Sequence, residues 1–142
     1  MRVKCISRDG ASLRVTCLDS NAGYGVGKTF PIKVGNCYTV YAMTTYLGQI
    51  WYHIWDDDSV YYPCWNPSPL FEIIDGRLSK YWLAGSRRAQ ADFVFMASYV
   101  EWVNDSGYVG RLIDNEPGAV SLFMRYKDLM DLEFQTSSPT MV

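Results

Sequence analysis

The clearest hydrophobic pattern lies in the middle of the chain. Residues 38–46 and 50–55 are dense in Tyr, Trp, Ile, Val and Thr, and the short segment Leu47-Gly48-Gln49 separates them. Aromatic and β-branched residues favour strands, and a short connection with glycine between two such runs is typical of a hairpin. The pattern therefore predicts a β-hairpin over residues 38–55.

Weaker patterns extend this hairpin on its C-terminal side. The turn Asp56-Asp57-Asp58-Ser59 leads into Val60-Tyr61-Tyr62, which we expect as a third strand, and Phe71–Ile74 is expected as a fourth before Asp75-Gly76. Between these two segments, Pro63, Pro67 and Pro69 exclude a central strand, because proline cannot donate to the hydrogen-bond ladder of a sheet. The predicted arrangement is a meander.

Two apolar runs near the N-terminus, Arg2–Ile6 and Leu13–Leu18, are predicted as additional strands. Together with the meander they would form a small antiparallel curled sheet or a partly open barrel. We therefore expect residues 1–82 to be mainly β.

The C-terminal third follows a helical period. In Ala119–Met130 the apolar residues fall on one helical stripe, and Asp114–Pro117 has the cap, acidic first turn and early proline of a helix start. Residues 92–104 are apolar almost all round, which fits a buried helix or a buried strand, and their length favours the helix. Residues 90–133 are thus expected to be mainly helical, with residues 136–142 as a frayed tail.

Length and composition set the broad class. A chain of 142 residues fits one domain, so residues 1–142 are predicted to form a single α+β domain. Apolar residues make up 49% and charged residues 20% of the chain, a balance that is typical of folded rather than disordered proteins. Charged residues interrupt Met1–Gly10, which is unlike a signal peptide, and no run is apolar enough to span a membrane. A cytoplasmic location is the resulting expectation.

The four cysteines do not form a metal-binding pattern. Cys5, Cys17, Cys37 and Cys64 include no C-x-x-C pair, and each lies in or beside an apolar run. We expect small buried side chains with inert thiols. The alternative is a disulfide, whose pairing the sequence does not choose.

One segment imitates a nucleotide-binding loop. Ala22–Thr29 has the spacing of a phosphate-binding P-loop if alanine is allowed for its first glycine. A P-loop opens a helix, whereas Phe30–Gly35 contains Pro31 and Gly35 and leads into an extended segment. A glycine-rich connection is the favoured interpretation, and no cofactor is expected.

Two further groups invite a chemical interpretation. His53 is the only histidine and could pair with Cys64, but no orienting third group accompanies them, so a structural role is favoured. Asp56, Asp57 and Asp58 could bind a hard cation, yet they lack the longer loop that would wrap an ion. We therefore expect neither catalytic residues nor a metal site, and we interpret the three aspartates as a turn.

Charge is segregated along the chain, although the net charge is only −2. Residues 49–76 contain five acidic residues and no lysine or arginine, and residues 92–142 contain eight acidic and three basic residues. Acidic segments rich in aromatic residues favour a basic protein partner over nucleic acid, whose phosphates require a basic stripe, although most of these rings could instead belong to the core. The expected partner-binding residues are Trp55, Asp56, Asp57, Asp58, Tyr61, Asp75, Asp114, Glu116, Asp128 and Asp131.

Four short segments carry a resemblance to known proteins: Val34–Val40, Tyr52–Asp58, Tyr62-Pro63 and Leu70–Asp75. Within residues 31–82 they resemble small bacterial and phage proteins with an SH3-like sheet, which implies an SH3-like partial barrel and no particular activity. The whole chain also resembles, more loosely, the immunity proteins that neutralise bacterial toxins. The basic segment 77–91 departs from the uniformly acidic surface of such inhibitors.

Two functional hypotheses follow. The first is an immunity protein that binds a basic, nuclease-type toxin domain and blocks its active-site cleft. The alternative is an SH3-like adaptor or phage accessory module that binds a peptide or nucleic acid through Arg77, Arg87 and Arg88. Both are binding functions without catalysis.

Overall fold

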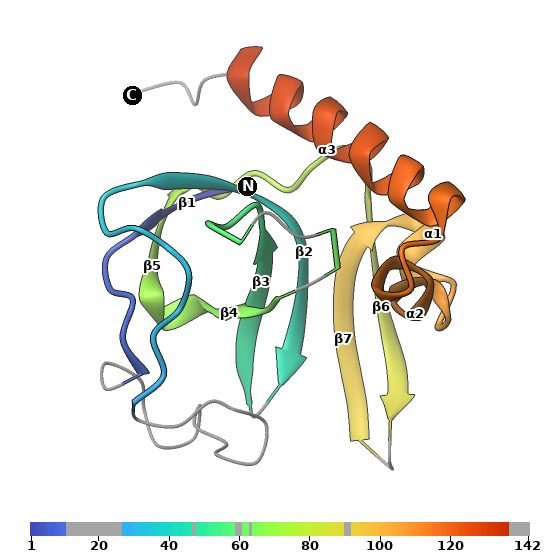
Figure 1. The fold of residues 1–142 in the computed structure, drawn as a ribbon, viewed down its shortest axis with the longest axis horizontal. Helices are drawn as coiled ribbons and strands as arrows, with labels where there is room; N and C mark the ends of the chain where they lie inside the picture. Colours follow the sequence, from blue (N-terminus) through green and yellow to red (C-terminus); the bar gives the residue numbers. More distant parts are fainter. Residues whose placement is uncertain (11–26, 47, 59–60, 63, 90–91, 137–142) are drawn as a thin grey trace.

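A computed structural model describes residues 1–10, 27–46, 48–58, 61–62, 64–89 and 92–136 (Figure 1). The elements are, in chain order, β1 (Arg2–Cys5), β2 (Cys37–Tyr46), β3 (Gln49–Ile54), β4 (Asn66–Pro67), the 3-10 turn η4 (Ser68–Leu70), β5 (Phe71–Asp75), β6 (Trp82–Ala89), β7 (Asp92–Tyr99), α1 (Val100–Val103), α2 (Tyr108–Ile113) and α3 (Pro117–Thr136). The fold is α+β, as predicted.

The strands form one antiparallel sheet that branches at β2. Five strands follow the order β4-β3-β2-β1-β5, and β7 also pairs with β2 and carries β6 on its other side. The branch is possible because β2 is long: Thr39 pairs with Arg2 of β1, whereas Met43 pairs with Ala97 of β7. The sheet therefore curls around β2 without closing.

The strand predictions are mostly confirmed. The hairpin of β2 and β3, the strand β5 and the N-terminal strand β1 lie where the sequence predicts them. Tyr61 and Tyr62, expected in a third strand, lie in a bend, and the next strand is the two-residue β4 at the edge of the sheet. An edge position tolerates Pro67, because a strand at the edge of a sheet has a partner on one side only and the missing N–H breaks no bond of the ladder on the other side. The segment Leu13–Leu18 lies outside the described residues.

The prediction of a helix over residues 92–104 is wrong. These residues form β7 and then the short helix α1. β7 lies between β2 and β6, and Met96, Ala97 and Tyr99 are all buried. A strand that is covered on both faces has a continuous apolar sequence, which is the same pattern as a buried helix.

The predicted C-terminal helix is confirmed as α3, which lies across one end of the sheet (Figure 1). Ala119, Phe123 and Met130 of the predicted stripe are buried, and Leu122 and Tyr126 are partly buried. The stripe covers β2 and β7 and forms, with α1 and α2, the second of two apolar clusters. The first cluster lies inside the curled strands β1 to β5, and the half-buried Trp65 and Trp82 pack against both.

Tyrosine side chains fix the start of α3. The hydroxyl groups of Tyr99 and Tyr108 lie 2.8 Å apart, and the Tyr108 hydroxyl donates to the Ala119 carbonyl at 2.8 Å. The ring of Tyr126 stacks on that of Tyr99 at 4.2 Å between centroids. The helix is therefore held to β7 and α2 by directional contacts as well as by apolar burial.

The cysteine prediction holds for only part of the set. Cys5 is buried, but Cys64 is half-buried and Cys37 is exposed, and Cys17 lies outside the described residues. Cys37 is the first residue of β2, and its neighbour Tyr38 faces the core, so strand alternation directs Cys37 outward. Cys5, Cys37 and Cys64 are all free thiols. In the described part of the chain, no helix is long and apolar enough to cross a membrane.

A close approach between β6 and α1 gives a test of this packing. A Cβ atom added at Gly85 would lie 2.7 Å from Cγ1 of Val103, closer than carbon atoms approach without displacement. We expect Gly85→Ala to lower the free energy of unfolding by about 1–3 kcal/mol, measured by urea denaturation. In a chain that already carries Val103→Ala, the Gly85→Ala substitution should lower the free energy of unfolding by much less than it does in the wild type.

Gly110→Ala is the matched control. Gly110 lies in α2 with no atom within 4 Å of the added Cβ, so alanine should stabilise the helix by about 0.5–1 kcal/mol. Equal stability of Gly85→Ala and the wild type would contradict the described contact.

Candidate functional site

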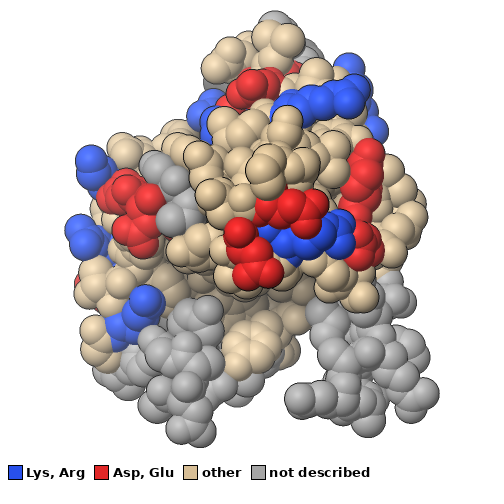
Figure 2. All heavy atoms as spheres, turned by 45° about the vertical axis from the view of Figure 1, so that its right-hand side comes forward, with Lys and Arg blue, Asp and Glu red and all other residues tan. Residues whose placement is uncertain are grey.

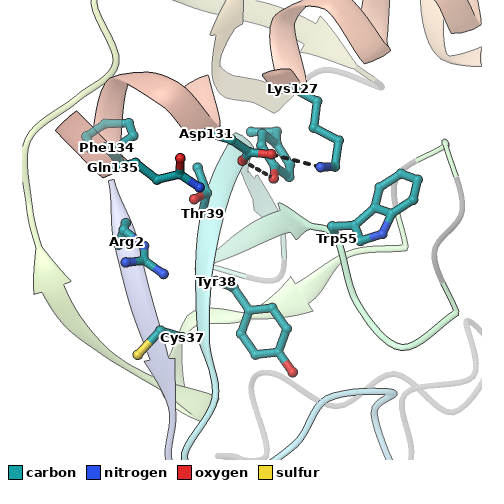
Figure 3. A pocket seen from close by; sticks show the side chains of 10 residues that line it. Arg2, Cys37, Tyr38, Thr39, Trp55, Lys127, Asp131, Phe134 and Gln135 are labelled. Atoms are coloured by element: carbon teal, nitrogen blue, oxygen red, sulfur yellow. Dashed lines mark hydrogen bonds and ion pairs between the residues drawn. The ribbon is translucent and has the colours of Figure 1, made fainter. Parts of the chain in front are cut away.

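A cleft of about 250 Å³ lies between β2 and the C-terminal half of α3 (Figure 3). β1 and β2 supply one wall, Trp55 closes one end, and α3 covers the top. The lining residues are Arg2, Cys37, Tyr38, Thr39, Tyr41, Trp55, Lys127, Asp131, Phe134 and Gln135. The cleft thus joins the first residues of the chain to the last helix.

A chain of polar contacts fixes the α3 side of this cleft. The Lys127 ammonium donates to Oδ2 of Asp131 at 2.8 Å, and the hydroxyl of Tyr41 donates to Oδ1 at 2.5 Å. Burial first, and the hydrogen bond to Asp131 second, raise the pKa of Tyr41 well above its ordinary value. Tyr41 is therefore a neutral donor, and the charges of Lys127 and Asp131 compensate each other.

Trp55 lies at the mouth of the cleft. Its ring stacks on that of Phe123 at 6.2 Å between centroids, and the ammonium of Lys127 lies 5.0 Å from its centre. The ring of Tyr61 is 6.2 Å away, and its side chain is exposed. Trp55 itself is half-buried, so one part of the ring is anchored and another faces solvent.

The acidic turn follows directly from Trp55. Asp57 and Asp58 are exposed, and no ion pair between described residues involves either carboxylate. Asp128, the residue after Lys127 in α3, is also exposed and equally lacks such an ion pair. We call Trp55, Asp57, Asp58, Tyr61 and Asp128 the acidic–aromatic patch.

Asp56 differs from its two neighbours, although the sequence places all three in one partner-binding set. It is only 4% exposed, and its Oδ1 accepts the N–H of Asp58 at 3.0 Å. This contact is the local turn that aspartate favours. Asp56 therefore shapes the turn and is not available on the surface.

Asp75 is also placed differently from the expected surface role. Its carboxylate is buried and pairs with the Arg77 guanidinium at 2.6 Å, while the N–H of Arg77 donates to it at 3.1 Å. The hydrogen bond from the Arg77 side chain is the main cause that holds the pKa of Asp75 below its usual value. Asp75 thus ends β5 with an internal ion pair.

The remaining predicted residues, Asp114 and Glu116, lie at the opposite end of α3. Glu116 is 15 residues from Asp131, a separation of roughly 20 Å along a helix. Glu116 and Asp105 both pair with Arg111, and Figure 2 shows acidic groups on either side of a basic group on this side of the molecule. A groove of about 490 Å³ runs beside them. The structure therefore buries Asp56 and Asp75 and divides the other predicted residues between two surfaces.

His53 lies in the core and has no access to solvent. It is 1% exposed, stacks on Phe123 at 5.2 Å, and is surrounded by the rings of Tyr41, Trp65 and Trp102. Neither ring nitrogen has a hydrogen-bond partner among the described residues. Burial lowers the pKa of His53 to about 3, so the imidazole is neutral at ordinary pH. This favours the structural role predicted from sequence.

The other chemical motifs can be placed only in part. Residues 22–26 of the P-loop imitation lie outside the described residues, and Gly27–Gly35 contains no helix. No cluster of three or more His, Cys, Asp or Glu side chains in the described ranges could hold a metal ion. No family model, curated protein or solved structure matches the chain.

The sequence interpretation did not predict the cleft. Its two cationic side chains, Arg2 and Lys127, and the neutral Tyr41 come from distant segments, and only the fold brings them together. The spacing of Lys127 and Asp131, four residues apart in a predicted helix, is the one signal that could have indicated part of it.

The burial of His53 predicts a specific pH dependence of stability. Because the pKa is about 3 in the folded chain and 6.5 for the solvated ring of the unfolded chain, the neutral ring stabilises the fold fully above pH 6.5. That stabilisation is lost as the pH falls from 6.5 toward 3, at about 1.4 kcal/mol per pH unit. We expect His53→Phe to lose this part of the slope in urea denaturation across that range.

His53→Phe keeps an aromatic ring beside Phe123, so its stability at neutral pH should stay close to that of the wild type. Identical slopes for the two proteins between these pH values would show that His53 is not the titrating group.

Proposed function

We propose that this chain is a non-catalytic binding protein that recognises a basic protein partner through the acidic–aromatic patch. The single observation that carries the proposal is the position of Trp55. The Phe123 ring and the Lys127 ammonium both contact its ring, and the exposed residues Asp57 and Asp58 follow it closely in the chain. A preorganised aromatic ring beside fixed charge has the composition of an interface hot spot.

The electrostatics of the patch support a basic partner. Lys127 is compensated by Asp131, so Asp57, Asp58 and Asp128 leave the patch with net negative charge. Exposed charges of one sign accelerate the encounter with a partner of the opposite sign, and salt screens the effect. The patch should therefore govern the rate of association more than the lifetime of the complex.

The narrower form of this proposal is an immunity protein for a bacterial toxin. A nuclease-type toxin domain has a basic substrate cleft, to which an anionic patch is complementary. Occupation of that cleft would exclude nucleic acid and so inhibit the toxin without any chemistry in this chain. The resemblance to immunity proteins and the charge of the patch are its support.

The adaptor alternative depends on Arg77, Arg87 and Arg88. The guanidinium of Arg77 is already paired with Asp75 and lies 5.8 Å from the centre of the Phe134 ring. It is therefore occupied within the fold, which favours the acidic–aromatic patch over a basic binding surface.

Charge reversal tests the steering role of the patch. The partner is first captured by pull-down from the native host. We expect Asp57→Lys combined with Asp58→Lys to slow association with this partner at least about tenfold at low salt, with a smaller effect at high salt. Asp56 is left intact because it shapes the turn. Association rates are measured by stopped flow or surface plasmon resonance.

The matched control reverses two exposed carboxylates outside the patch, Glu72→Lys and Asp114→Lys. It changes the net charge by the same amount and should leave most of the association rate intact. If the two double variants slow association equally, only net charge matters and the patch is not the interface.

Truncation of Trp55 tests the anchor. Trp55→Ala should speed dissociation of the complex and weaken binding by on the order of 2 kcal/mol, while association changes little. Trp55→Phe is the control, because it can keep the stacking on Phe123. Urea denaturation of both variants separates lost binding from lost stability, and unchanged dissociation of a folded Trp55→Ala variant would contradict the proposed anchor.

A further inference from the structure

The cleft beneath α3 contains a cationic group that the fold does not use. Arg2 lines this cleft, and its guanidinium makes no ion pair or hydrogen bond with any described residue. Its Nε atom is buried and has no hydrogen-bond partner in the described part of the chain. A buried donor without an acceptor is costly, because it gives up water and gains nothing in return.

The acidic groups nearest to Arg2 already have other partners. Asp131 in the same cleft accepts from Lys127 and Tyr41. Asp75 lies opposite Arg2 in the strand register and is paired with Arg77. Among the side chains that line the cleft, the uncompensated charge is therefore the single positive charge of Arg2.

The other walls of the cleft define the rest of a ligand. Thr39 and Gln135 contribute polar side chains on the α3 side of Arg2, and Phe134 contributes aromatic surface (Figure 3). The volume of about 250 Å³ exceeds the roughly 150 Å³ of a protein cavity that holds a benzene molecule. A ligand that fits these walls would have one anionic end facing Arg2 and a short planar or apolar body.

We propose that the cleft is a binding site for a carboxylate, held by the guanidinium of Arg2 with Thr39 and Gln135 beside it. A guanidinium presents a planar fork of N–H donors that matches the two oxygens of a carboxylate. One uncompensated positive charge suits a monoanion. This site is distinct from the acidic–aromatic patch, which selects the opposite charge, although Trp55 borders both.

The carboxylate could belong to a small free acid or to the C-terminus of a peptide chain. The probes are therefore 4-hydroxyphenylacetate and the dipeptide N-acetyl-Gly-Tyr with a free C-terminal carboxylate. The amides of both compounds are the uncharged controls. Each is titrated into the isotope-labelled full chain, and the NMR signals of the Arg2 side chain and of the Thr39 and Gln135 amides are followed.

We expect the acids to shift these signals with saturation, and the amides to bind at least tenfold more weakly. Arg2→Gln should abolish the shifts, and Arg2→Lys, which keeps the charge without the fork, should bind with intermediate affinity. Arg8→Gln is the matched control, because Arg8 is exposed and does not line the cleft.

The relative affinities identify the source of the ligand. Tighter binding of the free acid indicates a small molecule, and tighter binding of the dipeptide indicates a chain end. The proposal is overturned if neither acid shifts the cleft signals, if the amides bind as well as the acids, or if folded Arg2→Gln binds like the wild type. The Asp57 and Asp58 reversals do not alter these groups, so this site and the proposed function can fail separately.

Discussion

Phe123 is the contact on which the arrangement of both surfaces depends. Its ring, in the N-terminal half of α3, packs against Tyr41 of β2, His53 of β3 and Trp55 beyond β3, at 5.9, 5.2 and 6.2 Å between centroids. These contacts fix the helix across the end of the sheet. Without that position, Lys127 would not reach Trp55, Asp131 would not reach Tyr41, and no cleft would exist above Arg2. The apolar core therefore creates the polar site.

The sequence predicts those parts of the molecule in which local pattern decides the structure. The β2–β3 hairpin, β5 and α3 follow from strand-forming runs, turns and a helical stripe with its cap. β7 could not be predicted, because its place between β2 and β6 and the burial of Met96 and Tyr99 depend on elements distant in the chain. The same limit applies to the site: exposure separates Asp57 and Asp58 from Asp56 and Asp75, and exposure is a property of the tertiary fold.

The two proposed surfaces have opposite charge and share one ring. The acidic–aromatic patch contributes the exposed carboxylates of Asp57, Asp58 and Asp128, and Arg2 provides a cationic group in the adjoining cleft. A single protein partner that occupied both would have to place a basic surface and a carboxylate at fixed relative positions, and such a requirement gives specificity. Lys127 and Asp131 form an ion pair beside both surfaces, so their two charges compensate each other and add no net charge to either surface.

Hydrogen exchange of the full chain, measured with and without the partner captured by pull-down, shows whether the partner binds at the acidic–aromatic patch beside α3. Protection should appear in residues 54–58, 61–62 and 124–131, while residues 100–113 around Arg111 exchange as in the free chain. Protection confined to residues 100–113, with residues 54–58 and 124–131 unchanged, would place the interface at the other end of α3 and contradict the account.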